Sequence, residues 1–467
     1  MFALLPELAV LALALAVLLG DLLRKGRARE LAWLSVAGLA GAFLLTLRTT
    51  YGTLFTETLV ADAFGVVLKQ LFLAGTAVVI LLSMREMERF AWKAEYLSLV
   101  LFVCAGMMLM VSANELITLY VALEIVTITL FILTAYRKRD ALSVEAGLKL
   151  YVQGFASSGI LLYGLSLLYG ATNTTYLPAI AQALARGSPT ATLLLGAVMV
   201  LAGFGFKLSI VPFHMWVPDV YQGAPTPITA FLSVGSKAAG FAVAMRVLVL
   251  ALGSLQGHLI VVLGALAVVT MFLGNLLAIS QNNVKRLLAY STIAHVGYML
   301  LALVMSPKVG AASLLFYLAV YTFANLLAFA VLIALSDAGG GEDISAFSGL
   351  VTRSPWLAVA MVAALLSLGG IPPVAGFVGK FYLFANAVRE GFLLLALAGV
   401  VNTIISMYYY LRIVREMFIV KSAAPAVLPS FALKVAVALC LAAIVFFGLY
   451  PAPLLRSVEY AAALLVR

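Results

Sequence analysis

Charged residues are scarce in this sequence. Asp, Glu, Lys and Arg make up only 10% of its 467 residues, whereas hydrophobic residues make up 64%. Soluble domains contain about 25% charged residues and about 45–50% apolar ones. So few charges cannot cover the surface of a water-soluble chain of this length. The composition therefore predicts an integral membrane protein.

Cysteine and cofactor-binding motifs are also nearly absent. Cys104 and Cys440 lie far apart in apolar stretches, which excludes a disulfide framework and a cysteine-based metal site. The segment GFGFK at 203–207 has two glycines but no preceding strand, so it indicates close helix packing rather than nucleotide binding. We expect this chain to bind no metal, nucleotide, flavin or iron–sulfur cluster. The formal net charge of +10 is explained by membrane anchors and does not indicate nucleic-acid binding.

Long apolar runs are abundant. Only helices and closed barrels satisfy their backbone hydrogen bonds inside a bilayer, and these runs are continuous rather than alternating, which favours helices. At about 20 residues per crossing, the sequence predicts an all-α polytopic membrane protein with about fourteen transmembrane helices. The predicted spans are 4–23, 30–47, 62–83, 95–112, 115–135, 145–169, 190–211, 226–251, 257–279, 285–304, 311–335, 355–384 (interrupted), 391–417 and 431–449.

Basic residues cluster on alternate connections between these spans. The clusters lie at 84–93, 136–140, 282–286 and 412–421, and after the first span at Arg24, Lys25, Arg27 and Arg29. The positive-inside rule places these connections in the cytoplasm, so both termini are expected on the outer side. Because the basic residues follow the first apolar run instead of preceding it, this run is expected to be a membrane helix and not a secretory signal.

Several ionisable residues lie far from the ends of the predicted spans. They are Lys69, Glu124, Lys207, Lys237, His295 and Lys380. A lone Lys or Glu at the bilayer centre costs at least about 2.5–3.5 kcal/mol on insertion scales. These side chains should therefore face the bundle interior, pair with one another or reach water. The structural alternatives are static ion pairs, a hydrogen-bonded core histidine at position 295, and a snorkelling lysine at position 69.

Two predicted helices contain breaks beside these charges. Lys207 is followed by Pro212 and Pro218, and the segment GGIPP at 369–373 precedes Lys380. Proline removes a backbone donor and clashes with the preceding turn. At membrane depth such breaks persist only in the protein interior or beside a hydrated cavity. The charges and the breaks together predict a functional site rather than an inert bundle.

Broken helices at corresponding places in two halves indicate an internally duplicated transporter. We expect one transmembrane domain, with N-terminal helices at 1–94 and a C-terminal helix at 431–467. Between them, 95–251 and 257–417 are expected to form two inverted five-helix repeats, each with one broken helix. One pKa unit corresponds to about 1.36 kcal/mol, and moving a charge through 100 mV takes about 2.3 kcal/mol. Buried amines whose neighbours change charge can thus load and release protons.

The segment FKLSIVPFHMWVPDVYQGAPTPITAFLSVGSKAAGF at 206–241 resembles the signature of the antiporter-like membrane subunits of respiratory complex I, which are related to Mrp-type cation/proton antiporters. Further similar segments are 119–128, 281–299, 370–384 and 401–414. The chain looks most like the N type because of 133–175 and the lysine in GKF, where the M type has Glu. It also ends after the fourteenth predicted helix, without the lateral helix of the L type.

The resemblance implies roles for individual residues. Glu124 corresponds to the glutamate of the fifth helix and Lys207 to the lysine that pairs with it in the broken seventh helix. Lys237 corresponds to the eighth-helix lysine, and Lys380 to the exit-side lysine of the broken twelfth helix. His295 lies on the tenth helix within the central hydrophilic axis. These five residues are expected to form a proton relay.

The resemblance also implies a lysine near the inner end of the tenth helix, Lys285, and structural or gating positions at His214 and Asp219. It implies a proton-translocating subunit of NADH:quinone oxidoreductase in a bacterial inner membrane. NADH, FMN, iron–sulfur clusters and quinone would be bound by other subunits. The expected partners are the M-type subunit, small membrane subunits near the quinone site, and lipids. The alternatives are a Na⁺/H⁺ antiporter subunit, a ferredoxin-driven or hydrogenase membrane complex, and an inert scaffold.

Overall fold

The computed structural model describes residues 2–23, 26–187 and 190–465, so Arg24 and Lys25 of the first basic cluster lie outside the described residues. Thirteen of its helices are long and apolar enough to cross a membrane. They are α1 (Leu5–Leu23), α2 (Ala28–Thr46), α3 (Ala63–Met87), α4 (Lys93–Ser112), α5 (Leu116–Thr134), α6 (Ala141–Thr172), α8 (Ala191–Leu208), α10 (Thr226–Ala244, extended by a π-helical segment, Met245–Ala251), α11 (Gln256–Ile279), α12 (Val284–Val304), α13 (Pro307–Asp337), α17 (Leu393–Phe418) and α18 (Phe431–Leu449).

The other helices are shorter. They are α7 (Leu177–Arg186), α9 (Trp216–Gly223), α14 (Leu350–Arg353), α15 (Pro355–Gly369), α16 (Ala375–Arg389) and α19 (Ala452–Leu465), with 3₁₀ turns at Phe2–Leu4, Gly253–Leu255 and Ile344–Phe347. Helices α15 and α16 together form the interrupted span that the sequence predicts, so the thirteen long helices and this pair account for the expected spans. The prediction of an all-α polytopic membrane fold is confirmed.

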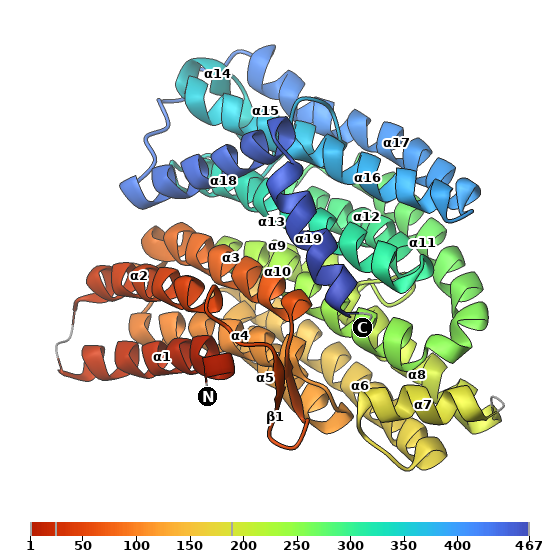
Figure 1. Ribbon diagram of the computed structural model, residues 1–467. Helices are drawn as coiled ribbons and strands as arrows, with labels where there is room; N and C mark the ends of the chain where they lie inside the picture. The colour runs from red at the N-terminus through yellow and green to blue at the C-terminus, as the bar shows by residue number, and fades with distance from the viewer. Residues whose placement is uncertain (1, 24–25, 188–189, 466–467) are drawn as a thin grey trace.

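The most deeply buried helices are α10, α12 and α13, which lie in the middle of the bundle (Figure 1). Figure 1 shows α1 to α6 on one side of them and α14 to α18 on the other. The outer helices α1, α2, α17 and α18 keep a large apolar fraction of their surface exposed, as expected where a helix faces lipid. Buried polar residues on the three central helices are therefore shielded from lipid on all sides.

Two helices are broken in the same way. Helix α8 ends at Leu208 and α15 ends at Gly369, and the next residue in each case has left-handed backbone angles, Ser209 (φ 69°) and Gly370 (φ 77°). At both ends, the N–H groups of this residue and of the one after it donate to carbonyls of the last helical turn at 2.8–3.1 Å. A proline follows three residues later. The two predicted breaks are confirmed, while the assignment of 95–251 and 257–417 as inverted repeats stays a prediction.

Besides the short helices α9 and α14, a hairpin and two further helices lie outside the predicted spans. A small antiparallel hairpin joins β1 (Gly52–Leu54) to β2 (Leu59–Ala61), and α7 lies between α6 and α8. The predicted C-terminal segment contains two helices, because the chain turns at Pro451 between α18 and α19. Helix α19 runs across α13 and α3 (Figure 1). Its charged residues Arg456 and Glu459 make it a less apolar helix than the spans.

Candidate functional site

Five of the six predicted site residues are buried inside the bundle. Lys207, Lys237, Lys285, His295 and Lys380 are between 0 and 8% exposed, and Glu124 is half-buried. They lie on α5, α8, α10, α12 and α16. Such burial rules out lysines that snorkel along a lipid-facing surface. Each buried ammonium must instead find hydrogen-bond acceptors within the protein, since isolated charges are costly in an apolar interior.

Lys207 of α8 contacts α5 one helical turn away from Glu124. The Lys207 Nζ donates to the Thr127 Oγ1 at 2.5 Å, and Thr127 follows Glu124 by three residues on α5. The Glu124 carboxylate accepts a hydrogen bond from the Ser158 hydroxyl of α6 at 2.6 Å. Among the ion pairs of the described residues, none joins Glu124 to Lys207 directly. The Lys207 amine therefore contacts a threonine hydroxyl of α5, and its pairing with Glu124 stays a prediction.

Lys237 is held at the broken end of α8. Its Nζ donates to the backbone carbonyl of Lys207 at 3.1 Å and to the Ser209 hydroxyl. The ammonium also lies over the Trp216 ring, 4.7 Å from the ring centre. The last carbonyls of a helix have no intrahelical donor and carry the negative end of the helix dipole. The break in α8 therefore supplies a polar, partly negative cradle for a cation in the middle of the bundle.

Lys380 has an equivalent environment at the second break. Its Nζ donates to the backbone carbonyl of Gly369, the last residue of α15, at 3.3 Å. The ammonium lies 4.7 Å from the centre of the Tyr298 ring. At both breaks a lysine thus donates to a carbonyl at the helix end and lies against the face of an aromatic ring, where a cation is favoured. This arrangement gives a physical reason for a broken helix beside a buried amine.

A row of neutral polar groups continues from Lys237 toward α12. Ser233 lies one turn before Lys237 on α10 and accepts a hydrogen bond from the Asn325 amide at 2.7 Å. The same amide nitrogen donates to the Tyr321 hydroxyl at 3.1 Å. Tyr321 in turn donates to the Thr292 hydroxyl of α12 at 2.9 Å. Hydrogen bonds among these four buried side chains thus join α10, α13 and α12 in the centre of the bundle.

His295 lies at the far end of this row. Its Nδ1 is 2.8 Å from the Tyr317 hydroxyl, and its Nε2 is 3.4 Å from the Tyr410 hydroxyl. Its ring packs against Tyr298, whose other contacts include the Lys380 ammonium. We call the succession of polar side chains from Glu124 to Lys380 the polar row. Hydroxyl and imidazole groups at these distances are suited to passing protons by reorientation.

Sequence reasoning missed the tyrosines and asparagines of the polar row. Tyr317, Tyr321 and Asn325 recur every four residues and so occupy one face of α13. That spacing within an otherwise apolar helix is the signal that could have identified them. Neutral polar residues are common in membrane helices, so composition alone does not distinguish them from ordinary interior residues.

Lys285 lies apart from the polar row, at the beginning of α12. Its Nζ donates to the Ala224 carbonyl at 2.8 Å and to the Glu342 carboxylate at 3.2 Å. The neighbouring Arg286 pairs with Asp219 at 2.7 Å. Asp219 also accepts from Lys149 at 2.7 Å. The signature residue Asp219 therefore joins α6, α9 and α12 at the basic end of the bundle.

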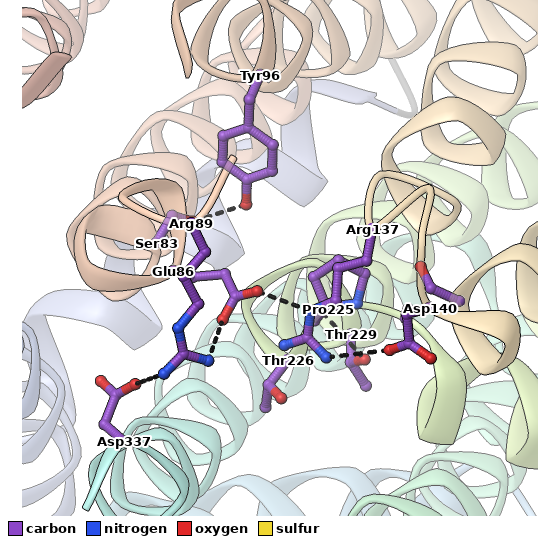
Figure 2. Close-up of polar contacts among 12 residues, drawn as sticks. Ser83, Glu86, Arg89, Tyr96, Arg137, Asp140, Pro225, Thr226, Thr229 and Asp337 are labelled. Atoms are coloured by element: carbon purple, nitrogen blue, oxygen red, sulfur yellow. Dashed lines mark hydrogen bonds and ion pairs between the residues drawn. The ribbon is translucent and has the colours of Figure 1, made fainter. Parts of the chain in front are cut away.

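A further ionic cluster joins the ends of α3, α5 and α13 at the same end of the molecule (Figure 2). Glu86 accepts from the Arg137 Nε at 2.7 Å and lies 3.7 Å from Arg89. Arg89 also approaches Asp337 at 3.9 Å, and Arg137 approaches Asp140 at 3.7 Å. Burial disfavours the charged form of Arg137, but the Glu86 carboxylate outweighs this effect and raises the pKa of the guanidinium. The ion pair with Glu86 therefore favours the charged form of Arg137.

Lys69 forms a second buried ion pair. Its Nζ lies 2.6 Å from the Glu7 Oε1, and both side chains are 1% exposed. The Ser112 hydroxyl donates to the same oxygen at 3.4 Å. Of the alternatives for Lys69, the structure supports the ion pair and excludes snorkelling. Within the described ranges, no group of three or more His, Cys, Asp and Glu side chains is placed to hold a metal ion.

The fold and the polar row define a class of protein: a polytopic membrane protein with buried ionisable groups at two helix breaks. A family model described as "NADH:quinone oxidoreductase/Mrp antiporter, TM" matches residues 113–406. This region contains all six predicted site residues and both breaks. The chain belongs to this family of membrane proteins.

Individual proteins with similar sequences support the assignment to this family. NADH-quinone oxidoreductase subunit N of Moorella thermoacetica is 43% identical over 96% of this chain and 95% of that protein. NAD(P)H-quinone oxidoreductase subunit 2 of Synechococcus elongatus is 42% identical over 89% of this chain and 81% of that protein.

Two solved structures have a fold similar to that of this chain. A chain of respiratory complex I from Thermus thermophilus is 32% identical with a TM-score of 0.82, covering 97% of this chain and 99% of that one. A chain of the Mrp complex from Dietzia sp. has a TM-score of 0.88 at 21% identity, covering 99% of this chain and 96% of that one, and shows the shared fold alone.

Proposed function

We propose that this chain is the proton-translocating, N-type membrane subunit of an NADH:quinone oxidoreductase. The observation that carries the proposal is the polar row, a succession of buried polar side chains that runs from the half-buried carboxylate of Glu124 toward the buried amine of Lys380 through the centre of the bundle. The family and the similarity to subunit N of other bacteria support the same assignment. The chain carries out no redox chemistry in this proposal.

The proposed mechanism uses charge changes between neighbouring amines. Lys207 and Lys237 are linked through a backbone carbonyl and the end of α8, so the two ammonium groups repel one another when both are charged. A proton arriving at one amine therefore favours release from the other. Ser233, Asn325 and Tyr321 would guide the released proton toward His295, and Lys380 would pass it outward. Lys285 would act near the inner entrance.

The proposed setting is a bacterial inner membrane with both termini on the outer side. The basic connections at 84–93, 136–140 and 282–286 would face the cytoplasm, as the positive-inside rule requires. Quinone reduction would take place in neighbouring subunits that bind NADH, FMN, iron–sulfur clusters and quinone. The M-type subunit and the small membrane subunits near the quinone site are the proposed neighbours.

The test is Lys237→Ala in the assembled complex. We expect proton pumping into sealed vesicles to fall at least tenfold, because an interaction worth about 1.4 kcal/mol or more in the pumping step is removed, while NADH oxidation by an artificial acceptor is retained. Lys434→Ala is the matched control, since Lys434 lies on the exposed side of α18. An unchanged number of protons per electron in the Lys237 variant would refute the proposal.

The family description names the Mrp antiporter beside NADH:quinone oxidoreductase, which gives one second candidate, exchange of Na⁺ for H⁺ driven by ion gradients alone. The same lysines would then serve exchange without electron transfer. Sealed vesicles separate the two functions: Na⁺ uptake driven by an imposed pH gradient, in the absence of any electron donor, would support exchange. Proton uptake that requires NADH and is unaffected by Na⁺ would support the oxidoreductase. A ferredoxin-driven or hydrogenase membrane complex would differ by its electron donor.

A further inference from the structure

One cavity lies outside the polar row, where the α3–α4 and α5–α6 connections meet. It has a volume of about 690 Å³, within the usual range for ligand pockets. Its lining includes four cationic side chains, Arg89, Arg137, Lys138 and Arg139, and two acidic ones, Glu86 and Asp140. We call it the interface pocket. It lies at the ends of four membrane helices, which is the depth of the lipid headgroups.

The acidic side chains of the interface pocket are already neutralised. Glu86 pairs with Arg137 and Arg89, and Asp140 lies beside Arg137 while its carboxylate caps α6 through the Leu142 N–H at 3.1 Å (Figure 2). In the described parts of the chain, the side chains of Lys138 and Arg139 form neither an ion pair nor a hydrogen bond, and both are exposed. The pocket therefore offers two uncompensated cations.

One wall of the interface pocket is aromatic and rigid. The Tyr136 hydroxyl donates to the backbone carbonyl of Trp92 at 2.5 Å, and the Tyr136 ring packs edge-on against Phe90 and Tyr96. Trp92 itself is 60% exposed. Tryptophan and tyrosine prefer the boundary between headgroups and acyl chains. An amphipathic ligand would thus find cations for its anionic part beside aromatic surface for its apolar part.

We infer that the interface pocket binds the phosphate headgroup of an anionic phospholipid, with Lys138 and Arg139 contacting the phosphate and Trp92 contacting the glycerol region. Arg and Lys bind phosphate oxygens through charge-assisted hydrogen bonds. The occupant is a lipid and not a soluble phosphate compound, because the exposed indole of Trp92 borders the pocket at the level where helices enter the bilayer. Proton translocation is not needed for this inference.

The experiment uses the intact complex that holds this chain, in nanodiscs of phosphatidylcholine titrated with spin-labelled phosphatidylglycerol. Each basic residue near an anionic membrane surface contributes about fivefold in affinity. Lys138→Ala together with Arg139→Ala is therefore expected to weaken retention of the immobilised phosphatidylglycerol about thirtyfold. The matched control is Arg415→Ala with Lys421→Ala, two exposed basic residues of another basic connection. The control should leave retention unchanged.

Three results would overturn the inference. The first is equal retention by the pocket variant and the control. The second is displacement of the labelled lipid by inorganic phosphate, which would indicate a site for soluble phosphate. The third is a polypeptide segment of a neighbouring subunit filling the pocket in the assembled complex. If the alanine variant is poorly assembled, Lys138→Gln with Arg139→Gln keeps the side-chain length and tests the same charges.

Discussion

Asn325 offers the sharpest test of the polar row, because it is the link between the two lysine sites. Its amide donates to Ser233 at 2.7 Å and to Tyr321 at 3.1 Å. An amide does not carry protons itself, so we regard Asn325 as a positioning residue that orients two hydroxyls. Asn325→Leu keeps the approximate volume of the side chain and removes both hydrogen bonds.

The structural cost of this change is small. The Ser233 hydroxyl still donates to the Ala230 carbonyl at 2.7 Å, and the Tyr321 hydroxyl still donates to Thr292. Each lost hydrogen bond contributes about 0.5–1.5 kcal/mol net, so Asn325→Leu should cost about 1–3 kcal/mol. The complex should assemble, while the connection between Lys237 and His295 is interrupted.

The assay is the number of protons pumped per NADH oxidised in sealed vesicles, measured alongside NADH oxidation with an artificial acceptor. We expect pumping to fall about tenfold or more, equivalent to about 1.4 kcal/mol in the transfer step, with acceptor reduction retained. Asn386→Leu is the matched control, since Asn386 is also buried and donates to Ser313 at 3.0 Å, but takes no part in the hydrogen bonds from Ser233 to Thr292.

Normal pumping by the Asn325 variant would show that protons do not pass between α10 and α13, and the reasoning would fail. Loss of pumping in both Asn325→Leu and Asn386→Leu would indicate that the loss results from disturbed packing and not from the missing hydrogen bonds. Recovery of pumping by Asn325→Ser, which restores a hydroxyl, would support positioning of a hydrogen-bonded chain over a purely steric role.

Other expected outcomes concern stability and are read from the thermal unfolding of the assembled complex. Glu7→Gln should destabilise the folded complex by about 3–5 kcal/mol, because it leaves the Lys69 charge buried without its partner. Adding Lys69→Met should restore much of the lost stability. Equal destabilisation by the single and double variants would contradict the ion-pair argument. Gly376→Ala should cost about 3 kcal/mol or more, since an added Cβ would lie 1.7 Å from the Ser367 carbonyl oxygen. Gly159→Ala has open space around it and should leave stability unchanged or slightly raised, so a similar loss at both glycines would refute the clash.

The sequence predicts where the two helices break, but not which side chains bind at the broken ends. Pro212 after α8, and the glycines and prolines of 369–373 after α15, mark the interruptions in any context, because their backbone effects are local. What the breaks do depends on Lys237, which lies on another helix and reaches the carbonyl of Lys207. No local pattern indicates which amine occupies a helix end.

The predicted pairing of Glu124 with Lys207 shows a similar division. The pairing itself is implied by the family resemblance and stays a prediction. Packing decides the partners, and the Lys207 amine reaches Thr127, one turn away from Glu124. A difference of one helical turn is only about 5.4 Å, which is less than the uncertainty of any span boundary.

The sequence by itself determined the membrane class, the succession of spans, the two helix breaks and the buried amines, because each follows from local composition and from the high cost of charges in lipid. Tertiary structure alone decided that Lys69 pairs with Glu7, that Asn325 joins Ser233 to Tyr321, and that each broken helix receives a lysine. For Asn325, Ser233 and Tyr321 the physical reason is that uncharged polar residues cost little in a membrane helix and leave no strong mark on the sequence, and for the charged residues it is that the sequence does not indicate the partner. Their partners lie on other helices, and only helix packing brings them within hydrogen-bonding distance.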